Sequence, residues 1–166
     1  MAWINDAAED TVRRTLHEVC AAPAWGRALL AGRPYAGLQA LLAAGDAATA
    51  ALTPAGLDEA LAGHPPIGRP RPGDRSAQEQ RGMSGAPEAL AEEMQTLNLA
   101  YQERFGHVFL ICATGLSAGQ LLEAARTRLG NPPETEREIV RTELGSIHRI
   151  RLARLSRPAG EKERCA

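Results

Sequence analysis

Apolar residues recur at helical spacing along most of the chain, with polar residues at the positions between them. The first predicted helix begins at Asp6, and Glu9 three residues later completes a capping-box pattern. Its apolar face continues at spacings of three and four residues, through Val12, Leu16, Val19 and Cys20. Shorter apolar stripes follow around residues 25–30 and 35–42. This first part of the chain therefore favours helices.

The same periodicity continues to residue 155. Thr53 is an N-cap followed by Pro54 at the first helical position, which predicts a helix through Leu61. Four more helices are predicted, from residue 76, over residues 87–105, over 117–130 and over 131–155. The chain is rich in Ala and Leu and only 4% aromatic, a composition that favours helix over strand. We therefore predict an all-α fold, a helical bundle of about seven to eight helices.

Two segments interrupt this pattern. Residues 63–73 contain four prolines and three glycines, which exclude regular structure and predict a Pro/Gly-rich active-site loop with His64 at its entrance. His107 to Cys112 is a continuous apolar run, which predicts either a short strand or an extended core segment.

The 166 residues suit one domain, which we assign to residues 1–156. From Arg157 the chain is charged and contains Pro and Gly, so residues 157–166 are expected to be a disordered tail. The formal net charge is −1, which gives no electrostatic footprint for nucleic acid or an anionic membrane. No apolar stretch is long enough to span a bilayer.

The three cysteines are widely spaced and form no C-x-x-C pair, so neither a disulfide framework nor a zinc site is expected. The acidic residues Asp6, Glu9 and Asp10 stand where a signal peptide would need a basic start. These features predict a soluble protein of a reducing compartment, most simply the cytoplasm. No metal-ligand cluster or nucleotide-binding motif appears, so no metal is expected.

Three polar positions are candidates for chemistry. His64 could be a loop histidine bonded to backbone, or a group that accepts and delivers a proton near neutral pH. Ser76 and Glu79 fit a capping box, which by itself explains both residues, although a carboxylate there could also face a loop histidine. Capping and catalysis are not exclusive.

Arg151 lies within the apolar stripe of the last predicted helix, whose other members are Val140, Leu144, Ile147 and Leu155. An arginine that faces a core is costly unless an anion or a carboxylate pairs with it. Periodicity leaves three interpretations open. Arg151 could form a structural ion pair, extend its head to water, or bind an anion.

Six segments, in this order, resemble the 2-oxo-4-hydroxy-4-carboxy-5-ureidoimidazoline (OHCU) decarboxylase family. They are Cys20 with Trp25, Arg33-Pro34-Tyr35, His64-Pro65-Pro66-Ile67-Gly68, Ser76-Ala77-Gln78-Glu79-Gln80, Asn98-Leu99-Ala100-Tyr101 with Arg104-Phe105-Gly106, and Ile147-His148-Arg149-Ile150-Arg151-Leu152. No single segment is specific, but the ordered set is. The resemblance covers residues 5 to 155. Pro66 and Tyr35 depart mildly from the family pattern.

The resemblance implies an all-α enzyme without metal or organic cofactor that converts OHCU to S-allantoin in urate breakdown. In this interpretation His64 transfers the proton, and Glu79 either orients and tunes His64 or repels the departing carboxylate. Arg151 binds a substrate oxygen anion, and hydrogen bonds come from Ser76, Gln80 and the backbone N–H groups of Ile111, Cys112 and Ala113. Family analogy also suggests a homodimer. Two alternatives remain: a hydrolase that acts on a related ureide, and a helical interaction module without activity.

Overall fold

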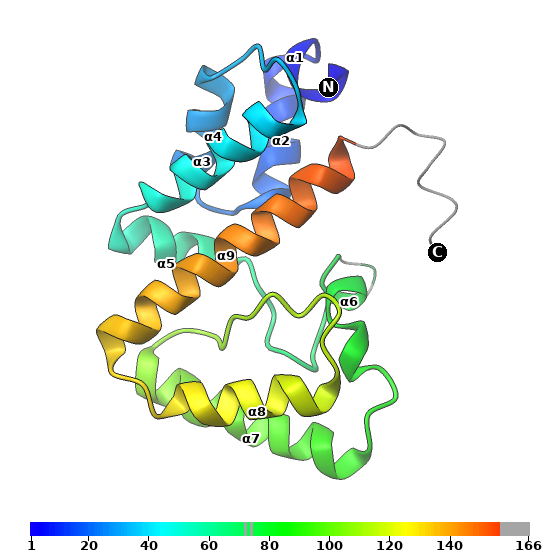
Figure 1. Ribbon diagram of the computed structural model, residues 1–166, viewed down its shortest axis with the longest axis vertical. Helices are drawn as coiled ribbons and strands as arrows, with labels where there is room; N and C mark the ends of the chain where they lie inside the picture. Colours follow the sequence, from blue (N-terminus) through cyan, green and yellow to red (C-terminus); the bar gives the residue numbers. More distant parts are fainter. Residues whose placement is uncertain (72, 74, 157–166) are drawn as a thin grey trace. The chain divides into compact units, whose positions relative to one another are not determined.

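The computed structural model describes residues 1–71, 73 and 75–156. Within them the chain forms nine α-helices, one short 3-10 helix and no strand (Figure 1). The helices are α1 (Ala2–Asn5), α2 (Glu9–Val19), α3 (Pro23–Ala31), α4 (Leu38–Ala50), α5 (Pro54–Ala62), α6 (Arg75–Glu79), η1 (Arg81–Met83), α7 (Glu88–Phe105), α8 (Ala118–Leu129) and α9 (Pro133–Leu155). The all-α prediction is confirmed, with slightly more helices than predicted. The predicted disordered tail, residues 157–166, lies outside the described residues.

Several predicted helix ends are present. The Thr53 hydroxyl accepts the N–H of Gly56 at 3.1 Å, at the start of α5. Ser117 and Gln120 form a complete capping box at the start of α8. Gly106 ends α7 with a φ of 77°, a backbone conformation that glycine adopts without strain.

The predicted start of the first helix is wrong. Asp6 does not cap α2, because its N–H donates to the carbonyl of Ala2 and Asp6 therefore closes the preceding helix α1. Helix α2 begins at Glu9, with Ala8 at the N-cap and no side-chain cap. The spacing of Asp6 and Glu9 fitted a capping box, but Asp6 instead serves as the C-cap of a short additional helix.

The chain forms two compact units. The first unit comprises residues 1–60 together with the chain from Gly145 onward, and the second comprises Leu61–Leu144. Helix α9 therefore contributes its first half to the second unit and its second half to the first. The assignment of residues 1–156 to one domain stays a prediction.

In the first unit, α3 packs against both α2 and α4. Trp25 on α3 is fully buried, and its indole N–H donates to the carbonyl of Gly45 and to the hydroxyl of Thr49. Thr49 in turn lies 2.9 Å from Nδ1 of His148 on α9. These bonds satisfy the indole N–H of Trp25 and the hydroxyl of Thr49 inside the core.

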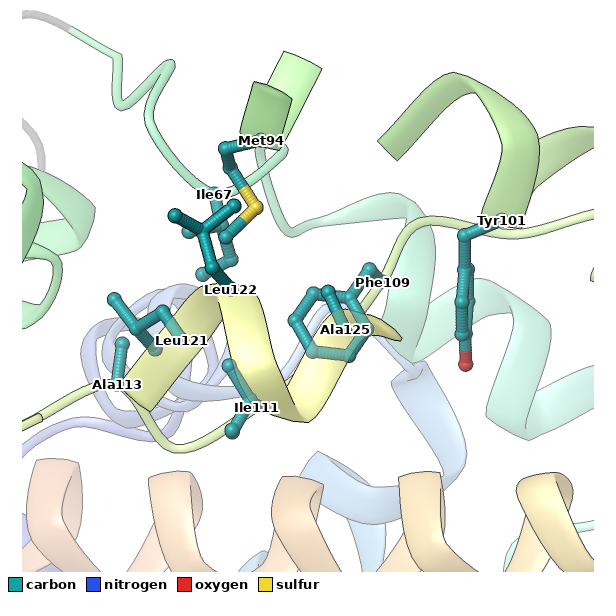
Figure 2. Close-up of a cluster of buried hydrophobic side chains, with 9 residues drawn as sticks. All are labelled: Ile67, Met94, Tyr101, Phe109, Ile111, Ala113, Leu121, Leu122 and Ala125. Carbon is teal, nitrogen blue, oxygen red and sulfur yellow. The ribbon is translucent and has the colours of Figure 1, made fainter. Parts of the chain in front are cut away.

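In the second unit, α7 lies beside α8 (Figure 1). Side chains of both helices join residues of two irregular segments in a hydrophobic cluster, drawn in Figure 2, of Ile67, Met94, Tyr101, Phe109, Ile111, Ala113, Leu121, Leu122 and Ala125. Gly82 in η1 approaches the carbonyl oxygen of Leu116 so closely that a Cβ would lie 1.8 Å from it. Only glycine fits there, and this contact fixes the chain after α6 against the start of α8.

Among the described residues, no single helix is both long and apolar enough to cross a membrane. Helices α4 and α5 reach that hydropathy only when taken together, and they meet at a bend of 115°.

Candidate active site

His64 begins the Pro/Gly-rich loop, directly after α5. Its backbone N–H donates to the carbonyl of Leu61, and the residue is 8% exposed. The predicted loop is confirmed over its described residues, which form no helix or strand. His64 is therefore a buried histidine at a helix end.

The loop that follows His64 is held by side chains from two directions. Gln80 Oε1 accepts the N–H of Gly68 at 2.9 Å, and Gln80 Nε2 donates to the carbonyl of Pro66 at 3.3 Å. From α7, the amide of Asn98 donates to the carbonyl of Ile67 at 2.8 Å. Ile67 itself is buried in the hydrophobic cluster. Together with the backbone bond from the N–H of Arg69 to the carbonyl of Pro66 at 3.1 Å, these contacts hold residues 66–68 in place.

Ser76 and Glu79 do not form the capping box that their spacing suggested. Ser76 lies within α6 rather than at its N-cap, and its hydroxyl accepts the N–H of Arg71 at 3.3 Å. Glu79 is the last residue of α6 and is half-buried. Capping therefore explains neither residue. Ser76 and Gln80 both hydrogen-bond backbone groups of the loop that begins at His64.

The apolar run that was predicted as strand or extended segment is not a strand. Phe109, Ile111 and Ala113 all belong to the hydrophobic cluster (Figure 2), whereas Cys112 is half-buried and outside it. This alternation is typical of an extended chain. The N–H of Cys112 donates to Glu143 Oε2 at 2.8 Å. Three backbone N–H groups were predicted to bind substrate. One of them, the N–H of Cys112, is therefore already hydrogen-bonded within the protein.

A buried ionic network, which was not predicted from the sequence, holds the same segment. Nε and Nη2 of Arg128 both donate to Glu136 Oε1, at 2.8 and 2.6 Å, and Nη1 donates to the carbonyl of Leu110 at 2.8 Å. Tyr101 donates its hydroxyl to the same carboxylate oxygen. Burial, followed by this bond to Glu136, raises the pKa of Tyr101. The missed signal was Arg128 itself, which follows Leu121 and Ala125 on the apolar face of α8.

Arg151 belongs to the first unit. It is 7% exposed, and its Nη1 donates to the carbonyl of Val19 at 3.0 Å. This burial excludes the interpretation in which the guanidinium extends into water. Arg151 also lies close enough to Cys20 to favour its thiolate, although burial dominates and raises the pKa of Cys20 to about 11. On the buried face of α9 the neighbour of Arg151 is Leu152, whereas the predicted Leu155 is partly exposed.

The first unit also contains a groove of about 860 Å³ between α2 and α3. Its lining is mainly apolar, with Arg13, Arg14 and Arg27 among its charged residues. None of the candidate site residues lines this groove. Separately, no group of three His, Cys, Asp or Glu side chains in the described part of the chain could hold a metal ion. The expectation of a metal-free site stays a prediction.

Comparison with known proteins identifies relatives over most of the chain. A family model for OHCU decarboxylase matches residues 5–153. An OHCU decarboxylase of Amia calva is 31% identical over 137 residues, which cover 78% of each chain. The uric acid degradation bifunctional protein TTL of Arabidopsis thaliana is 34% identical over 105 residues, 58% of this chain. The match spans about a third of the Arabidopsis protein, 32% of its length.

Two solved structures have a similar fold. A crystal structure of an OHCU decarboxylase in the presence of (S)-allantoin superposes with a TM-score of 0.76 at 21% identity, over 90% of this chain and 98% of that chain. An (S)-allantoin synthase superposes with a TM-score of 0.72 at 18% identity, over 91% of this chain and 52% of that one. At these identities the two structures show the fold alone.

Proposed function

Because the chain belongs to the OHCU decarboxylase family, we propose that it is a carboxy-lyase that converts OHCU to S-allantoin in urate breakdown. The family match over residues 5–153 carries this proposal, since that range includes every residue to which we assign a role. We also propose that the protein is cytoplasmic. We propose further that it forms a homodimer, and light scattering on the purified protein would test this oligomeric state.

The chemistry of OHCU suits a site built from amino-acid side chains alone. When the C–COO⁻ bond breaks, its electron pair moves into the conjugated C=N bond of the ring, and carbon dioxide leaves. The ring nitrogen that receives this pair takes up a proton. The hydroxyl on the carbon that lost carbon dioxide then loses its proton to form the carbonyl, and the carbon that bears the ureido group gains one. The substrate is its own electron sink, so no pyridoxal or thiamine is required.

His64 is the residue to which we assign proton transfer. An imidazole both accepts and donates a proton near neutral pH, so one histidine can serve the hydroxyl and the carbon. Its burial shields the carbanion-like intermediate from bulk water. Glu79, half-buried at the end of α6, would orient His64 or repel the departing carboxylate. The bonds to residues 66–68 support this assignment, because they fix the chain next to His64.

The remaining candidates bind the substrate. Arg151 would hold a substrate oxygen anion with its planar guanidinium. Ser76 and Gln80 would hydrogen-bond the ureido or ring amide groups, together with the backbone at Ile111 and Ala113.

Product analysis tests the activity. The purified enzyme should release carbon dioxide from OHCU made in situ from 5-hydroxyisourate, and should yield S-allantoin. Uncatalysed protonation of a planar carbon occurs on both faces, so optical rotation separates enzymatic from spontaneous product. If the enzyme does not accelerate the release of carbon dioxide and instead consumes water, it is a ureide hydrolase. Dialysis against a chelator should leave the activity intact, and recovery that depends on added metal would contradict the cofactor-free mechanism.

The pair His64 and Glu79 tests the mechanism. Glu79→Gln should lower kcat on the order of 10²-fold without loss of stability, since loss of a positioned acid–base group costs about 10²–10⁴-fold. His64→Asn should be at least as damaging, and the double variant little worse than His64→Asn, because the two residues act as one unit. Stereospecific S-allantoin from His64→Asn at the wild-type rate would remove His64 from the mechanism.

A further inference from the structure

Two consecutive peptide units in the extended segment are each held by a charged side chain. In the unit that joins Leu110 to Ile111, the carbonyl of Leu110 accepts from Arg128 Nη1 at 2.8 Å. In the unit that joins Ile111 to Cys112, the N–H of Cys112 donates to Glu143 Oε2 at 2.8 Å. A cation therefore binds the first unit and a carboxylate binds the second.

Peptide geometry fixes where the other half of each unit points. Both peptide bonds are trans, so the N–H of Ile111 points away from Arg128, and the carbonyl of Ile111 points away from Glu143. In an extended residue the N–H and the C=O point to the same side. Among the described residues, neither group of Ile111 has a hydrogen-bond partner. Ile111 thus presents a donor and an acceptor side by side on the edge of the segment opposite the two charges.

The two charges also strengthen this pair. A guanidinium on the carbonyl of Leu110 polarises that peptide unit and makes the N–H of Ile111 a better donor. A carboxylate on the N–H of Cys112 likewise makes the carbonyl of Ile111 a better acceptor. Arg128 is itself fixed, because its guanidinium lies 4.8 Å from the ring centre of Phe109 and is bound to the fully buried Glu136.

We propose that Arg128 and Glu143 are positioning residues that orient and polarise the N–H and C=O of Ile111 toward the substrate. The inference rests on the proposed function for the identity of the ligand. The chemical class that fits is a ureide or cyclic amide, which carries an N–H and a C=O side by side and can bond both groups at once. Neither Arg128 nor Glu143 touches the ligand in this arrangement.

Amide hydrogen exchange tests the positioning independently of catalysis. In the wild-type enzyme the Cys112 amide should exchange slowly, and Glu143→Ala should speed its exchange on the order of tenfold or more. Glu143→Gln keeps an acceptor oxygen and should restore most of the protection. Glu138→Ala is the matched control, because Glu138 lies on the same helix with a side chain 70% exposed. Unchanged Cys112 exchange in Glu143→Ala overturns the proposal, whatever reaction the enzyme catalyses.

Kinetics and ligand binding test the consequence. The Ile111 groups would bind substrate before and during the reaction, so Glu143→Ala should raise KM on the order of tenfold and change kcat less. S-allantoin should slow exchange of the Ile111 amide in the wild type and do so less in Glu143→Ala. A KM no higher than that of Glu138→Ala, alongside faster Cys112 exchange, would reduce Glu143 to a structural contact. If the enzyme does not convert OHCU but Glu143→Ala still speeds Cys112 exchange, the proposed function is refuted instead.

Discussion

Gln80→Met separates two roles that the structure permits for Gln80, a ligand of the substrate and a support of the loop. Gln80 is 6% exposed, and both ends of its amide bond residues 66–68. Methionine has a similar length and no amide. The substitution therefore keeps the volume of the side chain and removes both bonds, leaving the N–H of Gly68 and the carbonyl of Pro66 without this partner.

The expected cost follows from those two bonds. A buried polar group that loses its partner costs about 1–3 kcal/mol. Here the bond to Pro66 is long, at 3.3 Å, and Gly68 is exposed, so water can replace part of what is lost. We expect a loss of about 1–3 kcal/mol in total, which corresponds to a Tm lower by about 2–12 °C at about 2–4 °C per kcal/mol. A shift of His64 by about 1 Å would lower kcat/KM on the order of 10²-fold.

Thermal unfolding without ligand is the deciding assay, because a residue that only binds substrate contributes nothing there. Gln78→Met is the control, since Gln78 lies on α6 with an exposed side chain. It makes the same chemical change away from the loop and should leave both Tm and kcat/KM unchanged. An unaltered Tm in Gln80→Met together with a large fall in kcat/KM would refute the support role and indicate that Gln80 binds the substrate.

Arg151→Lys should lower kcat/KM on the order of tenfold or more with little change in helical content by circular dichroism, because an ammonium cannot reproduce a planar contact; a variant that unfolds would make Arg151 structural. Burial raises the pKa of Cys20 from 9.0 to about 11, so its contribution to stability is present below about pH 9 and lost as pH rises through 11. Native Cys20 should accordingly react with iodoacetamide at pH 8 far more slowly than in urea, and equal rates would contradict this burial. Arg128→Met should cost about 3–5 kcal/mol in urea unfolding, because the fully buried Glu136 loses its cation. Arg126→Met, at an exposed ion pair, should be nearly neutral, and equal losses would contradict the argument.

Much of the fold could be predicted because its signals are local. The helices from Pro54 and Ser117 begin where an N-cap residue precedes the apolar pattern, and both starts are confirmed. The same kind of local pattern was wrong at Asp6 and Ser76. A spacing of three residues between a small polar residue and a glutamate allows a capping box, but the neighbouring chain decides whether a helix begins there. At Asp6 an additional helix, α1, ends, and Ser76 already lies inside α6.

The supports of the site could not be predicted, because they join residues far apart in sequence. Asn98 lies 31 positions from Ile67, and Glu143 lies 31 positions from Cys112. No periodicity relates such pairs. Arg128 was open to prediction by the reasoning applied to Arg151, since each arginine lies on the apolar face of its helix.

Both segments that carry the candidate site lack regular structure, and this explains why polar side chains hydrogen-bond to them. A backbone without a partner strand leaves its N–H and C=O groups to be satisfied by side chains. Gln80 and Asn98 do this for residues 66–68, and Arg128 and Glu143 do it for residues 110–112. Because Arg128 and Glu143 satisfy one edge of the segment 110–112, the opposite edge at Ile111 remains available to a ligand while the segment stays fixed. Orientation of the substrate contributes to the rate of an enzymatic reaction, so the Gln80 and Glu143 variants should impair catalysis although neither alters His64, to which we assign proton transfer.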